Sequence, residues 1–151
     1  MENKIEQTAA NYIRLIPLLF SKLGDPNNGA SARKTPADLT HLQIHILEDM
    51  FHREDGLTMT QLAKNIRVSK QQLTPLVAKL EEKDYVDKFP DPADKRAVRL
   101  TLTDKGRAVV NVRWEQAHRD LCGQMEDLNE EDLADLDYSI TKIKRILSRL
   151  D

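Results

Sequence analysis

Cysteine, glycine and aromatic residues are scarce in this sequence of 151 residues. Its single cysteine, Cys122, cannot form an internal disulfide, which fits a reducing cytoplasm. No apolar run approaches the about 20 residues that a membrane span requires, and residues 1–4 lack the basic and then apolar layout of a signal peptide. Five glycines and 5% aromatic residues leave little material for an all-β sandwich. We therefore expect a cytoplasmic protein with no membrane partner.

The composition of 40% hydrophobic and 32% charged residues is typical of a folded chain, and the length suits one domain over residues 1–151. The formal net charge is -2, but the charges are unevenly distributed. Residues 58–107 hold 11 basic and seven acidic side chains, whereas residues 126–151 hold four basic and eight acidic ones. A basic middle beside an acidic end favours a polyanionic partner for the middle. Ordinary variation of surface charge is the alternative.

One helix-start pattern occurs four times. A hydrophobic residue precedes a Ser, Thr or Asn that can accept from the free backbone N–H groups of a first helical turn, and a polar residue follows three positions later. The pattern predicts helices that begin after Thr40, Thr58, Ser69 and Asn129.

Hydrophobic periodicity predicts two further helices. Apolar residues at three- and four-residue steps favour a helix over residues 4–23, which Pro17 should kink. The stretch 24–38 contains Gly, Pro, Asn and Ser and should form a loop. The other helix should cover residues 103–125, with these apolar residues available for burial: Ala108, Val112, Ala117, Leu121 and Met125.

Between residues 85 and 102 the hydrophobic period changes to two. Val98, Leu100 and Leu102 alternate with polar residues, which predicts a half-buried strand. Residues 86–89 supply a shorter partner strand, and the turn-rich connector 90–96 forms the tip of a hairpin.

The helices predicted at 58–66 and 69–83 are separated by two residues, too few to let them lie antiparallel, which is typical of a helix-turn-helix. The second helix has an apolar face and, opposite it, a polar face. The N-terminal half of the polar face is cationic, and this is the part of a recognition helix that reaches base edges. Gln can pair with adenine, and Lys can donate to guanine. A solvated polar face without a ligand is the alternative. The apolar face of this helix consists of Leu73, Leu76, Val77 and Leu80.

The hairpin tip presents a second cationic feature. Lys95 and Arg96 follow Asp94, whose carboxylate could hold the Arg96 guanidinium. A pre-oriented arginine on a narrow hairpin suits a DNA minor groove; a salt bridge that only stabilises the turn is the alternative. The predicted DNA-binding residues are Thr58, Thr60, Ser69, Lys70, Gln71, Gln72, Thr74, Pro75, Lys79, Asp94, Lys95 and Arg96.

Several residues also stand in the order of a known family's motif. The pattern resembles the MarR (multiple antibiotic resistance regulator) family of bacterial winged helix-turn-helix transcription factors over residues 39–106. The resemblance implies a mainly α fold with a small β-hairpin wing, a homodimer held by helices at 4–23 and 107–151, helix 69–83 in the major groove and Arg96 in the minor groove, with Asp94 positioning Arg96. The matching residues are Leu39-Thr40-x-x-Gln43, Leu62-Ala63, Val68-Ser69, Leu73-Thr74-x-Leu76-Val77, Leu80-Glu81, Asp91-Pro92-x-Asp94-x-Arg96 and Leu102-Thr103-x-x-Gly106.

Two residues depart from the family's pattern. Asp84 stands where the family usually has Gly after the recognition helix; Asp tolerates the left-handed conformation better than most residues. Pro75 lies within the recognition helix, where it should remove one hydrogen bond and bend the reading face.

The C-terminal segment shows a heptad pattern that needs a partner. The partner is either another helix of the same chain or a second subunit, and both arrangements can hold together. In a twofold dimer the recognition helices would lie about 34–36 Å apart, which favours a pseudo-palindromic DNA site. The predicted dimerisation residues are Ile5, Ile13, Ile16, Leu136, Ile140, Ile143, Leu147 and Leu150.

We expect neither a metal nor a cofactor. His41 and His45 lie one turn apart and His118 lies on another helix, but no paired His or Cys motif completes a zinc site. For Cys122, a small residue packed in an interface is favoured over a redox sensor. The family resemblance leaves room for a small-molecule effector in a pocket between the dimer helices and the winged lobe.

The sequence therefore favours a DNA-binding transcriptional regulator, in particular a repressor that acts by occlusion. A winged-helix module that binds protein and not DNA is the alternative. An enzyme is disfavoured because the sequence has no nucleophile–base constellation, phosphate loop or strong metal motif.

Overall fold

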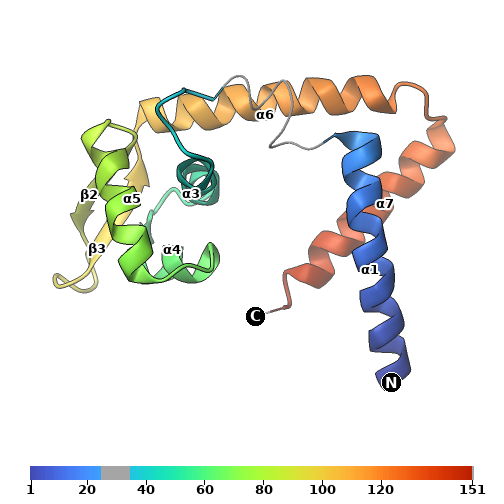
Figure 1. Cartoon of the computed structure of the whole chain (residues 1–151), viewed down its shortest axis with the longest axis horizontal. Coiled ribbons are helices and arrows are strands. Elements are labelled where there is room, and N and C mark those ends of the chain that lie inside the picture. The colour runs from blue at the N-terminus through green and yellow to red at the C-terminus, as the bar shows by residue number, and fades with distance from the viewer. Residues whose placement is uncertain (25–34, 151) are drawn as a thin grey trace. The chain divides into compact units, whose positions relative to one another are not determined.

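The computed structural model describes residues 1–24 and 35–150. Contacts group the chain into two compact units, Met1–Gly24 with His118–Asp151 and Asp25–Ala117. The mainly α fold with a small β-sheet is confirmed, while most of the loop predicted at 24–38 lies outside the described residues. The described elements are α1 (Glu2–Leu23), α3 (His41–Phe51), β1 (Leu57–Thr58), α4 (Met59–Asn65), α5 (Lys70–Glu82), β2 (Val86–Pro90), β3 (Val98–Leu102), α6 (Asp104–Met125) and α7 (Glu130–Leu147) (Figure 1).

All four predicted helix starts are present. Thr40, Thr58 and Ser69 cap α3, α4 and α5, and each forms a complete capping box with the glutamine three residues later. Asn129 caps α7 by accepting from the backbone N–H of Asp132 at 2.8 Å. A cap of this kind stabilises a helix by about 1 kcal/mol, so the sequence fixes these starts locally.

The sheet of the unit Asp25–Ala117 has three antiparallel strands in the order β1-β3-β2. β2 and β3 pair from Val86 opposite Leu102 to Pro90 opposite Val98, which confirms the predicted hairpin, although β2 is as long as β3 and not shorter. The sequence did not predict β1, whose Leu57 pairs with Leu100. Two residues are too few for a strand alternation to be visible in a sequence.

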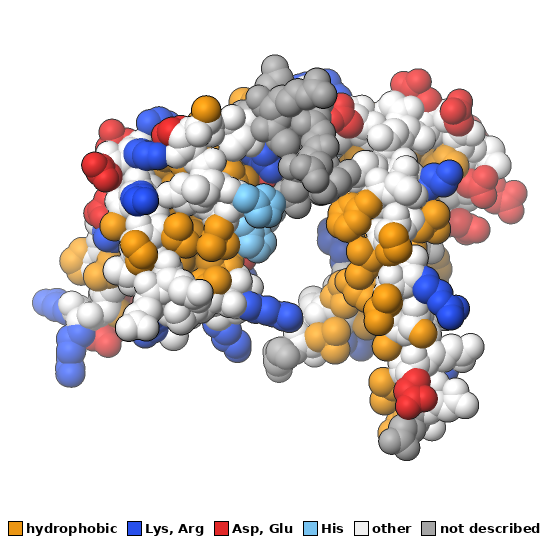
Figure 2. Space-filling model, viewed as in Figure 1, with side chains coloured by type: hydrophobic (Ala, Val, Ile, Leu, Met, Phe, Trp, Pro, Cys, Tyr) orange, Lys and Arg blue, Asp and Glu red, His pale blue; other side chains and the backbone are white. Residues whose placement is uncertain are grey.

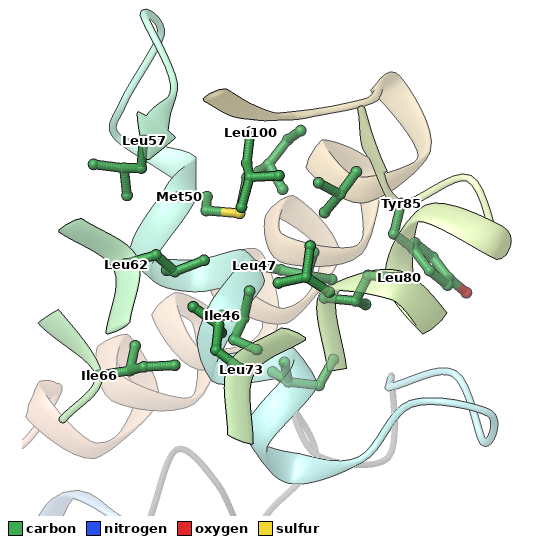
Figure 3. Close-up of a cluster of buried hydrophobic side chains, with 14 of the residues drawn as sticks. Ile46, Leu47, Met50, Leu57, Leu62, Ile66, Leu73, Leu80, Tyr85 and Leu100 are labelled. Atoms are coloured by element: carbon green, nitrogen blue, oxygen red, sulfur yellow. The ribbon is translucent and has the colours of Figure 1, made fainter. Parts of the chain in front are cut away.

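The core of this unit lies where α3, α4 and α5 pack against one another and against the sheet (Figure 3). Full burial of one such side chain contributes about 1.5–3 kcal/mol. The core therefore joins α5 and the hairpin into one body, so side chains on their outer surfaces have fixed relative positions. The side chains with 0% exposure are Ile46, Leu47, Leu62, Leu73, Leu80, Leu100 and Val110.

Helix α6 begins and ends as predicted but buries a different face. Of the five residues expected to be available for burial, Val112 is 43% exposed and Ala108 is exposed in the single chain, whereas the other three are half-buried: Ala117, Leu121 and Met125. The buried positions are held by Gly106, Val110 and Arg113. Hydrophobic periodicity counts apolar residues only, and it therefore missed a face that contains a buried arginine.

The unit Met1–Gly24 with His118–Asp151 contains two amphipathic helices, α1 and α7. Helix α1 continues through Pro17. Leu150 lies beyond the end of α7 at Leu147, so the predicted heptad pattern continues past the helix that carries it. Among the described helices, none is both long and apolar enough to cross a membrane.

Candidate nucleic-acid interface

The turn between α4 and α5 is built from two adjoining helix-end motifs. At the end of α4, Arg67 adopts a left-handed conformation with φ 56°. The N–H of Arg67 donates to the carbonyl of Lys64 at 3.3 Å, and the N–H of Val68 donates to that of Ala63 at 3.1 Å. This is a Schellman motif, and the capping box of Ser69 follows it directly. Two residues therefore suffice to end one helix and start the next, which confirms the predicted helix-turn-helix.

Helix α5 also ends in a Schellman motif. Asp84 follows the helix at the position where the family usually has glycine. Asp84 has φ 60°, so it adopts the left-handed conformation expected from the family resemblance. Its N–H donates to the carbonyl of Glu81 at 3.0 Å, and the N–H of Tyr85 donates to that of Leu80 at 2.9 Å. Tyr85 then leads directly into β2, so the end of α5 sets the start of the wing hairpin.

The two faces of α5 divide as predicted. Leu73, Val77 and Leu80 are buried, and Leu76 is half-buried. The exposed face carries the polar and cationic side chains that the sequence assigns to DNA, all of them exposed: Ser69, Lys70, Gln71, Gln72, Thr74, Pro75 and Lys79.

The two glutamines on this face differ in their hydrogen bonds. Gln72 Oε1 accepts from the backbone N–H of Ser69 at 3.1 Å, so half of its amide is occupied by the capping box. The side chain of Gln71 makes no hydrogen bond within the described part of the chain, and the residue is exposed. Bidentate pairing with adenine needs both amide atoms. Gln71 is therefore better suited than Gln72 to that contact.

Some of the predicted contact residues also have structural duties. Thr58 caps α4 by accepting from the Gln61 N–H at 3.2 Å, and the Thr74 hydroxyl donates to the carbonyl of Lys70 at 2.7 Å. Thr60 is exposed. Helix α5 runs through Pro75 without interruption, although proline has no N–H to donate to the carbonyl four residues earlier.

The tip of the wing presents Lys95 and Arg96 as exposed side chains, and Figure 2 shows the Lys and Arg side chains gathered at the end of this hairpin. Asp94 does not hold the Arg96 guanidinium as the sequence suggested. Its Oδ1 instead accepts from the backbone N–H of Arg96 at 3.0 Å. The carboxylate of Asp94 therefore shapes the turn, and the Arg96 guanidinium extends without a protein partner among the described residues.

A different ion pair, between Asp91 and Arg99, lies at the base of the tip. Asp91 is 6% exposed; its Oδ2 accepts from Arg99 Nε at 2.9 Å and its Oδ1 from the Ala93 N–H at 2.7 Å. The hydrogen bond from Ala93 and the pair with Arg99 outweigh desolvation and lower the pKa of Asp91. The sequence did not assign these residues a role. The sequence held two signals for this pair. Asp91 directly precedes the turn-forming Pro92, and Arg99 is a polar residue of β3, two positions from Ala97, which lies opposite Asp91.

Asp91→Asn should test this ion pair through its pH dependence. Because the pKa of Asp91 is lowered on folding, its ionised form stabilises the folded chain above the unfolded pKa of about 3.9, and this contribution is lost as the pH falls through the lower folded value. We expect the difference in unfolding free energy between wild type and D91N to shrink as the pH is lowered from about 6 to about 3. Urea titrations at each pH measure it; a difference independent of pH would contradict the assignment.

All the predicted dimerisation residues but one are exposed, on α1, on α7 and just after the end of α7, and Figure 2 shows hydrophobic side chains along α1. Several exposed apolar residues on one helix, in contrast to apolar residues scattered singly, are typical of protein interfaces. Leu136 is half-buried. The exposed fractions of the others are 65% for Ile5, 66% for Ile13, 37% for Ile16, 43% for Ile140, 42% for Ile143, 46% for Leu147 and 71% for Leu150.

The other chemical groups have these positions. His41 and His45 are exposed, and the described residues contain no group of three or more side chains that could hold a metal. Cys122 is exposed in the single chain and lies 3.7 Å from His118 Nε2. A cavity of about 290 Å³ lies against α3 and α6, lined by Thr35, Pro36, Ala37, Leu39, His41, Ile44 and Arg113.

A family model described as MarR family matches residues 39–98. The chain is 30% identical over 111 residues to the multiple antibiotic resistance protein MarR of Salmonella typhimurium, covering 72% of this chain and 76% of that protein. It is 31% identical over 98 residues to the transcriptional activatory protein BadR of Rhodopseudomonas palustris, covering 64% of this chain but only 56% of that protein. The crystal structure of Streptococcus pneumoniae FabT in complex with DNA shares the fold, with a TM-score of 0.62, 18% identity and 100% coverage of both chains.

Proposed function

The chain belongs to the MarR family of DNA-binding transcriptional regulators, and we propose that it acts as a homodimeric repressor that recognises a pseudo-palindromic operator. One observation carries the proposal. The exposed, polar N-terminal half of α5 and the exposed Arg96 at the wing tip belong to one packed unit. A helix that reads base edges in the major groove and a hairpin arginine in the adjacent minor groove are compatible with one such body.

The dimer is the second part of the proposal. The apolar residues of α1 and α7 are exposed in the single chain, and a second copy would cover them. A twofold dimer presents two equal reading surfaces, and half-sites about 34–36 Å apart place both in the major groove on one side of a duplex. The operator is therefore expected to be pseudo-palindromic.

Repression follows from occlusion, since a dimer that covers two successive half-sites blocks polymerase from the same DNA. An activator, as the name of BadR states for that protein, needs in addition a surface that recruits polymerase. For a small-molecule effector, we propose the cavity beside Arg113, whose lining combines apolar side chains with Thr35, His41 and the Arg113 side chain, which is paired with Glu48.

Selection from a random DNA pool, followed by mobility shifts across salt concentrations, tests the proposal. The selected sequences should show two related half-sites about one helical turn apart. The logarithm of the binding constant should fall linearly with the logarithm of salt concentration, with a slope of about -0.9 for each phosphate contact. If no duplex binds at low ionic strength, the winged-helix lobe serves protein contacts instead, and the proposal is wrong.

Substitutions in the two reading elements should have different effects. Arg96→Ala should weaken binding by about 1–3 kcal/mol, whereas Arg149→Ala, which makes the same charge change in the segment after α7, should have little effect. Gln71→Ala should reduce base discrimination by a similar amount and leave stability unchanged, because its side chain has no partner in the described chain. Gln72→Ala should instead lower stability by about 1 kcal/mol through loss of the capping box. Unaltered operator affinity of Arg96→Ala would refute the wing assignment.

A further inference from the structure

One side chain that lies outside the wing tip, that of Arg99, contacts the turn of the tip. Arg99 lies on β3, opposite Phe89 of β2 and Thr58 of β1, so it is in the central strand of the sheet. Its side chain is 25% exposed. From this position the guanidinium reaches across both neighbouring segments.

On one side, Arg99 binds the turn that shapes the tip. Its Nε donates to Asp91 Oδ2 at 2.9 Å. The other carboxylate oxygen of Asp91 accepts from the Ala93 N–H at 2.7 Å, and the backbone N–H of Asp91 donates to the carbonyl of Ala97 at 2.9 Å. Asp91 therefore forms hydrogen bonds to both sides of the turn, and Arg99 links Asp91 to the sheet.

On the other side, Arg99 binds the loop that precedes β1. Its Nη1 donates to the carbonyls of Asp55 at 2.9 Å and Gly56 at 3.2 Å. Gly56 has φ 76°, and a Cβ atom at this position would lie 2.5 Å from the carbonyl oxygen of Leu100. Only glycine permits this approach, so the two acceptor carbonyls are held against the sheet.

The guanidinium of Arg99 thus donates to three protein acceptors, whereas the guanidinium of Arg96 has no partner among the described residues. We propose that Arg99 is a positioning residue for DNA recognition: it clamps Asp91 to the backbone of residues 55–56 and so holds the wing in the orientation from which Arg96 reaches the duplex. This inference rests on the proposed DNA-binding function. Its physical basis is pre-organisation, because a tip that is already ordered loses less conformational freedom on binding.

The clamp depends on the planar fork of arginine. A lysine ammonium is a compact point charge on a flexible stem, and it cannot span the carboxylate and the two carbonyls in the same geometry. A direct phosphate contact by Arg99, the competing explanation, would largely survive replacement by lysine, because the charge is kept. Arg99→Lys therefore separates the two roles.

Asp91→Asn separates the clamp from simple electrostatics. Removing a negative charge near the DNA-binding surface should by itself strengthen binding to a polyanion. If the clamp positions Arg96, D91N should weaken binding instead. Asp87→Asn is the matched control, since Asp87 is an exposed carboxylate on β2 with no hydrogen bond or ion pair among the described residues.

The experiment measures affinity for the selected duplex by mobility shift, using full-length variants whose folding is checked by circular dichroism. We expect R99K and D91N each to weaken binding about tenfold, and D87N to bind as tightly as wild type or slightly more tightly. The double variant R96A/R99K should bind within about twofold of R96A alone, because Arg99 acts through Arg96. Amide exchange of Ala97 in free R99K should be faster than in wild type, reporting a loosened tip.

Three outcomes would overturn the inference alone: wild-type affinity of R99K, binding by D91N that is as tight as that of D87N, or losses from R96A and R99K that add in the double variant. All three leave DNA binding by the wild type intact. Failure of the wild type to bind any duplex at low salt would instead overturn the proposed function, and the clamp's role in recognition with it.

Discussion

Ile143→Glu is expected to convert the proposed dimer to monomers and to abolish tight binding to the proposed two-half-site operator. Ile143 is 42% exposed on α7, within the apolar surface that we assign to the second subunit. A dimer would bury two ionised carboxylates, one from each chain, without a cationic partner in the heptad pattern, and each costs several kcal/mol. The dimer dissociation constant should rise at least about 100-fold, which corresponds to about 3 kcal/mol. Analytical ultracentrifugation and mobility shifts measure the two effects.

Ala134→Glu is the matched control for this prediction. Ala134 lies nine residues earlier on α7, which places it half a turn around the helix from Ile143, and its side chain is exposed. The same charge is added to the same helix, so non-specific electrostatic repulsion affects both variants alike. A134E should remain dimeric. If I143E also remains dimeric, or if both variants dissociate equally, the α7 apolar surface is not the dimer contact.

The features that could be predicted from the sequence are those set by local chemistry. A capping box needs only residues three positions apart, so Thr40, Thr58 and Ser69 identified the starts of α3, α4 and α5 without knowledge of the fold. The left-handed conformation of Asp84 was expected in addition from the family resemblance, because Asp stands where the family usually has Gly and tolerates this conformation better than most residues. The polar face of α5 followed from its helical period alone.

The features that could not be predicted depend on partners distant in sequence. Asp94 lies two residues from Arg96, and proximity suggested a pair between their side chains; the turn geometry directs the Asp94 carboxylate to a backbone N–H instead. The pair that forms, Asp91 with Arg99, spans the hairpin, and Arg99 also needs the carbonyl of Asp55, 44 residues away. The buried face of α6 was missed for the same reason, since the position of Arg113 is explained by Glu48 on α3.

Gly106→Ala should be the most destabilising of the small substitutions in α6. A Cβ atom at Gly106 would lie 2.2 Å from the carbonyl oxygen of Tyr85, a backbone atom that also accepts from the Thr103 N–H at 3.2 Å. Relief of the clash requires the first turn of α6 to move away from the junction between α5 and the wing. We expect the free energy of unfolding to fall by about 3 kcal/mol.

Gly123→Ala, in the same helix, should have the opposite sign. A Cβ atom at Gly123 would meet no atom within 4 Å beyond the adjoining backbone of its own helix, and alanine loses less backbone entropy than glycine in a helix. The free energy of unfolding should therefore rise by about 0.5–1 kcal/mol. Urea titrations of both variants at one fixed protein concentration, which the proposed dimer makes necessary, provide the comparison. Because the chemical change is identical, a G106A variant as stable as G123A would show that α6 does not pack against Tyr85, and the junction that holds the wing to α5 would have to be arranged differently.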